Sequence, residues 1–201
     1  KDDYVVNKNG YVFFWKNTKY EDKGDRVYYF DGEHKPKQVS GKPITIMDNK
    51  LMPGMVESQG KEGRITTYGQ TSNIHDAANL FKFAADNSVV EWKLDVYENE
   101  NDGPTAIIIT DHKGSVESGN NAKRRTAVNG RKKIDIHSHP GDESQGASAS
   151  DMKYINSRNN AVYLKRDRTL HDYNSKKSNI TTIHINTIED LQKYIQDRLK
   201  K

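Results

Sequence analysis

The chain has 201 residues, of which 33 % are hydrophobic and 30 % charged, which suits one compact domain, or one domain with a small appendage, around a modest core. The absence of cysteine excludes a disulfide framework, a thiolate nucleophile, an iron–sulfur cluster and a Cys-ligated zinc site. A net charge of +4 is compatible with nucleic acid as a partner without requiring it.

Residues 1–70 are predicted to form a β-rich N-terminal region or accessory segment. The pairs Asn9-Gly10 and Asp31-Gly32 favour positive φ and indicate hairpin turns. Short strands are expected near 4–6, 11–16, 26–31 and 43–47. Residues 50–70 contain Pro53 and several glycines and are predicted to be a loop or linker.

Residues 71–201 show a different pattern and are predicted to form a second domain. Ser72 is the expected cap of a helix that has an apolar face and ends at Asp86-Asn87. Apolar residues from Val90 to Val96 then alternate with polar ones, which is typical of a strand. Further strands are expected at 106–109 and 134–137, separated by a polar and basic loop over 113–133.

The C-terminal part is predicted to contain two helices and three short strands. One helix is expected from Ser148 to about Arg158, followed by strands near 161–165, 169–173 and 180–185. The last helix begins after Thr187, which forms a capping-box-like pair with Asp190. The order of these elements predicts an α+β, or mixed α/β, fold.

The segment Ile136-His137-Ser138-His139-Pro140 carries the strongest chemical signal. Residues two apart on a strand face the same side, so His137 and His139 can present two imidazoles to one point. A catalytic zinc ion usually has three protein ligands. Asp151, in the first turn of the helix expected from Ser148, is the predicted third ligand.

A zinc site that activates water also needs a group that takes and returns a proton. Glu91 is the candidate, because it lies near the start of a strand on the face opposite its apolar residues. A solvated glutamate on an outer strand face is the alternative interpretation. Ser148 can reach the same site, or it can simply cap the following helix.

Together, Glu91, His137-Ser138-His139-Pro140 and Ser148-x-x-Asp151 resemble the JAMM (MPN-plus, JAB-domain) metalloproteases over roughly residues 72–185. The segment Phe83–Asn87, leading into Val90-Glu91-Trp92, is similar to the JAB-like toxin domains at the C-termini of bacterial RHS-type polymorphic toxins. The resemblance implies a JAMM/cytidine-deaminase-like core, a central sheet flanked by helices.

The resemblance also implies roles for individual residues. His137, His139 and Asp151 would bind one Zn²⁺, Glu91 would be the general acid/base, and Ser148 would help to stabilise the oxyanion during hydrolysis of a peptide or isopeptide bond. Eight residues, 140–147, separate His139 from Ser148, where the family usually has seven. Ser150 is therefore a neighbouring candidate for the oxyanion role.

A toxin of this kind would act on a protein or peptide substrate, and a cognate immunity protein would be its partner in the producing cell. The chain begins at Lys1 without a leader, so it is expected to be a piece of a larger protein that is secreted or delivered into a target cell. No apolar run approaches the ~20 residues that a membrane-spanning helix needs.

Two other functions stay open at this point. The first is a metal-dependent nuclease toxin, since a basic chain with paired histidines could direct a metal-activated water at phosphate. Against it, the sequence has no cluster of acidic residues of the type that holds Mg²⁺ near phosphates. The second is a non-catalytic JAMM-like binding module, which the complete set of ligand types disfavours.

Overall fold

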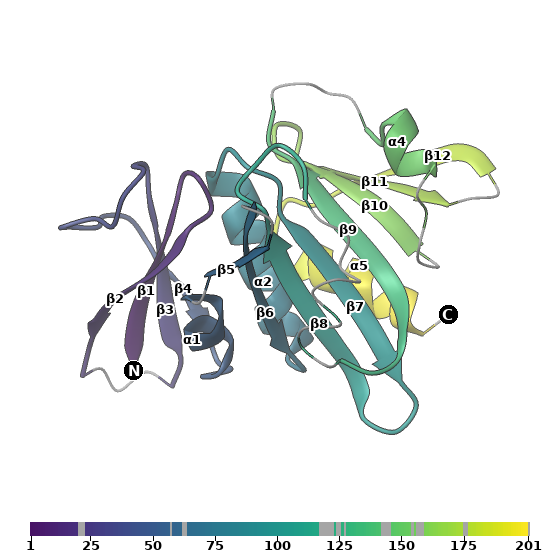
Figure 1. Ribbon diagram of the computed structural model, residues 1–201. Coiled ribbons are helices and arrows are strands. Elements are labelled where there is room, and N and C mark those ends of the chain that lie inside the picture. The colour runs from purple at the N-terminus through teal and green to yellow at the C-terminus, as the bar shows by residue number, and fades with distance from the viewer. Residues whose placement is uncertain are drawn as a thin grey trace.

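The computed structural model describes residues 1–19, 23–56, 58–61, 64–116, 123, 126, 128–141, 146–153, 155, 159–174 and 177–200. Within these residues the protein is an α+β fold with two sheets and four helices, as predicted (Figure 1). The smaller sheet has the order β2 (Val12–Asn17), β1 (Asp2–Asn7), β3 (Asp25–Phe30) and β4 (Ile44–Ile46). Its strands β1 and β3 are parallel, and its other pairs are antiparallel.

The larger sheet has eight strands and positions the candidate site. Its order is β12 (Lys177–His184), β11 (Thr169–Asn174), β10 (Asn159–Leu164), β9 (Arg131–His139), β7 (Lys93–Asn99), β8 (Gly103–Thr110), β6 (Arg64–Thr71) and β5 (Ser58–Lys61). Among its strand pairs in the described residues, β9 and β10 alone are parallel, and the short helix α4 (Ala149–Lys153) lies in the connection between them.

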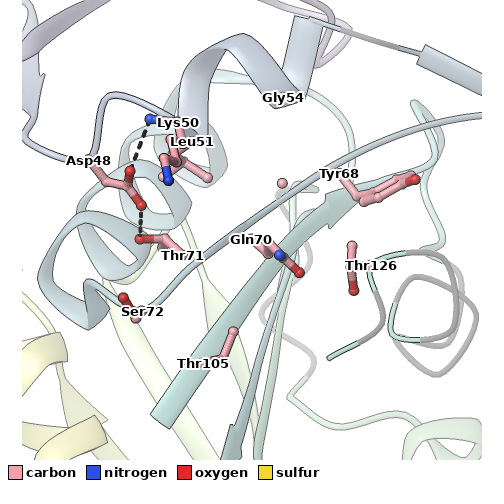
Figure 2. A pocket seen from close by; sticks show the side chains of 11 residues that line it. Asp48, Lys50, Leu51, Gly54, Tyr68, Gln70, Thr71, Ser72, Thr105 and Thr126 are labelled. Atoms are coloured by element: carbon pink, nitrogen blue, oxygen red, sulfur yellow. Dashed lines mark hydrogen bonds between the residues drawn. The ribbon is translucent and has the colours of Figure 1, made fainter. Parts of the chain in front are cut away.

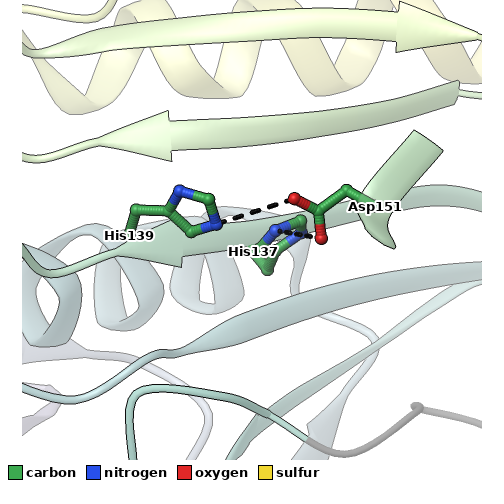
Figure 3. Close-up of side chains that lie close together, drawn as sticks. All are labelled: His137, His139 and Asp151. Carbon is green, nitrogen blue, oxygen red and sulfur yellow. Dashed lines mark ion pairs between the residues drawn. The ribbon is translucent and has the colours of Figure 1, made fainter. Parts of the chain in front are cut away.

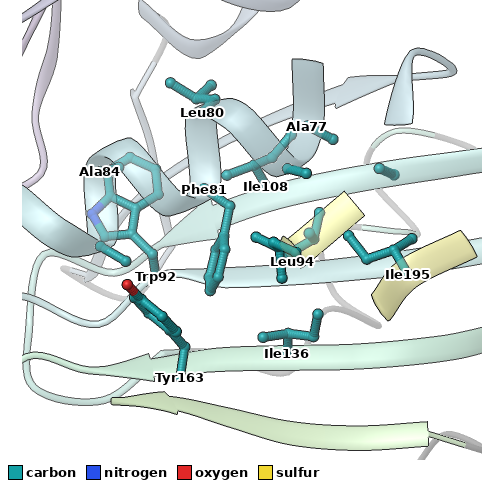
Figure 4. Packing of buried hydrophobic residues seen from close by; sticks show 14 of the residues in the cluster. Ala77, Leu80, Phe81, Ala84, Trp92, Leu94, Ile108, Ile136, Tyr163 and Ile195 are labelled. Atoms are coloured by element: carbon teal, nitrogen blue, oxygen red, sulfur yellow. The ribbon is translucent and has the colours of Figure 1, made fainter. Parts of the chain in front are cut away.

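Two long helices, α2 (Ile74–Asn87) and α5 (Ile188–Leu199), cover one face of this sheet (Figure 1). Beneath them lies the main core, in which Phe81 packs edge-on against Tyr163 with ring centroids 6.3 Å apart (Figure 4). Trp92, Leu94 and Ile136 point into the same layer and are fully buried. The predicted apolar stripes of both helices are confirmed, and so is the capping box of Thr187 and Asp190.

The prediction of a loop or linker over 50–70 is wrong. This segment forms helix α1 (Leu51–Val56) and strands β5 and β6. Pro53 is tolerated because it lies in the first helical turn, where its missing N–H has no intrahelical partner. Gly69 is a packing glycine of β6, since a side chain there would overlap Met55 and Leu51. The glycines that suggested a linker thus include one that permits close contact between a helix and a strand.

Three predicted boundaries also need correction. Asn73 and not Ser72 caps α2, because the Asn73 side chain accepts a hydrogen bond from the Asp76 N–H. Residues 131–133, assigned to a loop, begin strand β9. Helix α4 is much shorter than the predicted helix, since Ile155 is not helical and packs into a small apolar cluster; Tyr154 and residues 156–158 lie outside the described residues.

The two regions separated at residue 70 share one hydrophobic core. Strand β6 crosses that boundary, and the main cluster includes Tyr4, Val6 and Val27 of the small sheet together with residues of α2. The division into 1–70 and 71–201 stays a prediction. No helix in the described part of the chain is long and apolar enough to cross a membrane.

Candidate metal centre

The candidate site lies at the end of β9, on the sheet face opposite α2 and α5. Ile136 and Ser138 face the helices or the core. His137 and His139 alternate with them along β9 and therefore face the other side of the sheet. His137 is paired with Lys93 of β7 on one side and with Val162 of β10 on the other. The two imidazole rings are therefore held by a central strand, and their centroids are 5.1 Å apart.

Asp151 reaches this point from the first turn of α4 (Figure 3). Its carboxylate accepts a hydrogen bond from the Ser148 N–H at 2.6 Å, and its own N–H donates to the Ser148 hydroxyl at 3.1 Å. This reciprocal pair is a capping arrangement, and it fixes the Asp151 side chain relative to the helix start. The carboxylate is thereby aimed at the histidines.

The three side chains have the spacing of a metal-binding cluster. One ligand atom from each of His137, His139 and Asp151 lies within 4.8 Å of the others. The His137 Nε2–Asp151 Oδ1 distance is 3.2 Å, and the His139 Nε2–Asp151 Oδ2 distance is 3.8 Å (Figure 3). Tetrahedral zinc with bonds near 2.0–2.1 Å places its ligand atoms about 3.3 Å apart. Both distances from the histidine nitrogens to the Asp151 carboxylate are within about 0.5 Å of that separation.

The chemistry of the donors also fits a metal ion. Nε2 of His137 is buried and faces the Asp151 carboxylate, with Oδ1 3.2 Å away. A metal ion bound by both groups would use the imidazole nitrogen and the carboxylate oxygen that face each other here. Two imidazole nitrogens and one carboxylate are a typical set of protein ligands for catalytic zinc, which binds a water molecule at its fourth position.

The Asp151 carboxylate is held in its ionised form. Burial alone would raise its pKa, but the hydrogen bond and charge of His137 and the hydrogen bonds from Ser148 keep the pKa well below its usual range. A ligand carboxylate must be deprotonated to bind a metal. This pKa shift therefore suits Asp151 to the role of ligand.

Glu91 lies beside the same cluster, two residues before β7 begins. Its Oε1 is 3.8 Å from His139 Nε2, and its side chain is 12 % exposed. Burial raises the pKa of Glu91 to about 7, and the nearby charge of Asp151 adds to this, while the charge of His137 opposes it. The alternative interpretation, a solvated glutamate on an outer strand face, does not agree with this low exposure. A carboxyl group with a pKa near neutrality can both accept and return a proton.

The serine candidates differ in what the structure describes. Ser148 is exposed and its hydroxyl caps α4, so the alternative role considered for it, that of a helix cap, is present. Its role toward an oxyanion stays a prediction. The side chain of Ser150 lies outside the described residues.

Sequence reasoning missed the residues that hold Glu91 and β9 together. The Ser138 hydroxyl accepts a hydrogen bond from the Trp92 N–H at 2.9 Å, and the Ser138 N–H donates to the Trp92 carbonyl at 2.8 Å. The Thr110 hydroxyl donates to the Glu91 carbonyl at 2.7 Å. These contacts join residues far apart in the chain. Of the residues involved, only Ser138 belongs to a motif visible in the sequence, as the central residue of His-x-His.

A buried ionic layer lies next to His137 on the same sheet face. Lys132 is 2.8 Å from Asp95 and 3.2 Å from Asp135, and Lys93 is 3.0 Å from Asp135. The alternation over 90–96 suggested an open polar face, yet Lys93 and Asp95 are buried. Burial raises the pKa of Asp95, and the adjacent charge of Asp135 adds to the increase, while Lys93 and Lys132 oppose it.

A cavity of about 510 Å³ lies elsewhere, between α1, β6 and Thr126 (Figure 2). Its lining includes Asp48, which accepts hydrogen bonds from the Thr71 hydroxyl and the Lys50 N–H. None of the predicted site residues lines this cavity. The candidate chemistry is thus at the end of β9 and not in this cavity.

Comparison with known proteins agrees with this geometry. Residues 69–185 match the family described as JAB-like toxin 1, and the match includes Glu91, both histidines and Asp151. The chain belongs to this family, and it is a toxin module with a JAB-like fold. No curated protein matches the chain. No solved structure matches it either.

Proposed function

We propose that this toxin module is a zinc-dependent peptidase or isopeptidase of the JAMM type. The observation that carries the proposal is the convergence of His137, His139 and Asp151 on one point, with the partly buried Glu91 carboxyl 3.8 Å from His139. The proposed ligands come from β9 and α4, and the proposed general base comes from the segment before β7. Three protein ligands leave one position for water, as in catalytic zinc sites.

In this proposal His137, His139 and Asp151 hold the ion. Bound zinc would polarise the amide carbonyl and lower the pKa of its water toward ~7. Glu91 would accept the proton of that water and pass it to the leaving amine, because its own pKa is about 7. Ser148, at the start of α4, would donate to the oxyanion, and Ser150 is the other candidate for this step.

The membership of a toxin family supports delivery of the module into a target cell as part of a larger secreted bacterial protein of the RHS type. A protein or peptide would be its substrate there. A cognate immunity protein would protect the producing cell. The donor set favours this proposal over a Mg²⁺-dependent nuclease, because two imidazoles with one carboxylate are typical zinc ligands, whereas Mg²⁺ prefers oxygen ligands.

The test is incubation of the zinc-loaded protein with a lysate of target cells, followed by mass spectrometry of newly formed protein N-termini and cleaved lysine linkages. Wild type should generate new termini or release isopeptide-linked chains, and Glu91→Gln should be at least about 10²-fold slower, because it removes the general base. Plasmid DNA and total RNA are added to parallel reactions.

The control is Glu98→Gln on strand β7. The Glu98 carboxylate lies beside Lys133 and away from the cluster. The Glu98→Gln protein should cleave at the wild-type rate. Cleavage of nucleic acid without cleavage of protein would replace the peptidase with a nuclease. A folded, zinc-loaded protein that cleaves neither would support the binding module.

A further inference from the structure

We infer that the tip of the β1–β2 hairpin, Lys8–Tyr11, and His112 are positioning residues for Glu91. This inference rests on the proposed role of Glu91 as the general base. The hairpin tip belongs to the small N-terminal sheet, and it lies outside the part of the chain that matches the toxin family. Residues 8–11 of the N-terminal region thereby take part in the site, a role that neither the motif nor the family match assigns to them.

Glu91 is not held by sheet pairing, because β7 begins only at Lys93. Both of its backbone polar groups are bound by one neighbouring segment instead. Its N–H donates to the Lys113 carbonyl at 2.9 Å, and its carbonyl accepts from the Thr110 hydroxyl at 2.7 Å. The position of the Glu91 backbone therefore depends on residues 110–113.

His112 is the central residue of that segment and is held on three sides. Its ring stacks on Tyr11 with centroids 3.9 Å apart and planes 9° apart. Nδ1 is 2.9 Å from the Asn9 carbonyl oxygen, so this nitrogen carries the hydrogen, and Nε2 is 2.9 Å from the Thr67 hydroxyl. The hairpin tip thus supplies both a stacking surface and an acceptor.

The backbone at His112 needs these contacts. Its φ of 57° is in the left-handed region, which is unfavourable for a residue with a large side chain. Such a conformation persists only where surrounding contacts impose it. Its N–H also donates to the Thr110 hydroxyl at 3.2 Å, the same hydroxyl that binds the Glu91 carbonyl. Release of His112 would therefore loosen both hydrogen bonds of the Glu91 backbone.

The hairpin tip also contacts the Glu91 segment directly. The Val89 N–H donates to the Lys8 carbonyl at 2.8 Å. Gly10, at φ +78°, lies so close that a Cβ would come 2.8 Å from Val90 Cγ2. Lys8–Tyr11 of the small sheet thus fix both the residues immediately before Glu91 and the segment 110–113.

The test compares Tyr11→Ala and His112→Asn with wild type. Asn tolerates the left-handed conformation but removes the stacked ring. Arg168→Asn is the matched control, because Arg168 has a φ of 50° in the turn between β10 and β11, where its carbonyl accepts a hydrogen bond from the Ile185 N–H. Amide hydrogen exchange at Val89 and Glu91, zinc content and cleavage rate in the target-cell lysate are measured for all four proteins.

We expect amide exchange at Val89 and Glu91 to rise about tenfold or more in both Tyr11→Ala and His112→Asn, since local opening becomes easier. Cleavage should slow about tenfold or more while zinc content stays at the wild-type value, because the base moves and the ligands do not. Arg168→Asn should match wild type in all three measurements.

Unchanged exchange in both variants overturns the inference, as does faster exchange with an unaltered cleavage rate in an active enzyme. Failure of the proposed function looks different, because wild type itself would then bind no zinc or cleave no protein. Two variants are used so that a folding defect in one leaves the other to decide.

Discussion

The two faces of the eight-stranded sheet are built on different principles. The face under α2 and α5 is apolar, and its strands present residues such as Leu94 and Ile136 to the helices. The centre of the opposite face holds Asp95, Asp135 and His137, which are also buried. Apolar packing tolerates many combinations of side chains, whereas buried charges require defined partners. The candidate metal centre lies on the face where positions are most constrained.

The apolar face should show the larger loss of stability on truncation. Phe81→Ala removes a fully buried ring that packs against Tyr163, and we expect the free energy of unfolding to fall by about 3–5 kcal/mol. Urea denaturation measures this change. Ile180→Ala is the control, because Ile180 is 44 % exposed, and it should change stability by less than about 1 kcal/mol. Equal losses would mean that this core is not the main source of stability.

The ionic face should respond to the loss of one partner. Lys132→Met leaves Asp95 and Asp135 buried, with Lys93 still paired with Asp135, and we expect a loss of about 3 kcal/mol in the free energy of unfolding. The double variant Lys132→Met/Asp95→Leu should recover much of this loss, because no unpaired charge remains. The exposed pair of Lys8 and Glu33 is the comparison, and Lys8→Met should cost about 1 kcal/mol or less. A double variant no more stable than the single one would argue against a paired ionic layer.

Glu91 should make the stability of the metal-free protein depend on pH. Its pKa is raised from 4.5 to about 7 by burial, so the folded state binds a proton more tightly than the unfolded state does. The free energy of unfolding of wild type, relative to that of Glu91→Gln, should be greatest below pH 4.5 and decline as the pH rises through 7. Between pH 4.5 and pH 8 this difference should shift by roughly 1–3 kcal/mol in favour of Glu91→Gln. Chemical denaturation with a chelator at several pH values tests this, and a difference independent of pH would contradict the buried carboxyl.

The smallest effects concern two similar helix caps, one in the site and one remote from it. Ser148 caps α4 beside Asp151, and Thr187 caps α5 with Asp190. Ser148→Ala and Thr187→Ala should each lower stability by about 1 kcal/mol. Only Ser148→Ala should also weaken zinc binding, since its hydroxyl orients the backbone of a proposed ligand. Similar zinc affinity in both variants would show that the α4 cap does not support the site.

Much of this architecture was predictable from local patterns. The stripes of α2 and α5, the capping box at Thr187 and the His-x-His strand follow from periodicity and turn chemistry within a few residues. Helix α1 and strands β5 and β6 were missed because their signal is tertiary: Gly69 has its role only against Met55, which packs on it from α1. The burial of Lys93 and Asp95 was missed for the same reason, since their partners Asp135 and Lys132 lie on another strand.

The candidate site shows the same division. The identities of His137, His139, Asp151 and Glu91 could be proposed from spacing and family resemblance. The contacts that fix Glu91 could not, because they come from the segment 110–113 and from the hairpin of the small sheet. Neither segment is close to Glu91 in sequence, and the Asn9-Gly10 pair predicts a hairpin turn without showing what the turn contacts.

The most direct test of the proposed metal centre is the zinc content of purified protein after metal stripping and repletion, measured by elemental mass spectrometry. Wild type, His139→Ala and Asp151→Ala are compared, with His75→Ala as a control for an exposed histidine outside the cluster. We expect about one zinc ion per chain in wild type and His75→Ala, and its loss in the two ligand variants. A folded wild-type protein that binds no zinc, or ligand variants that bind it as wild type does, would contradict the assignment.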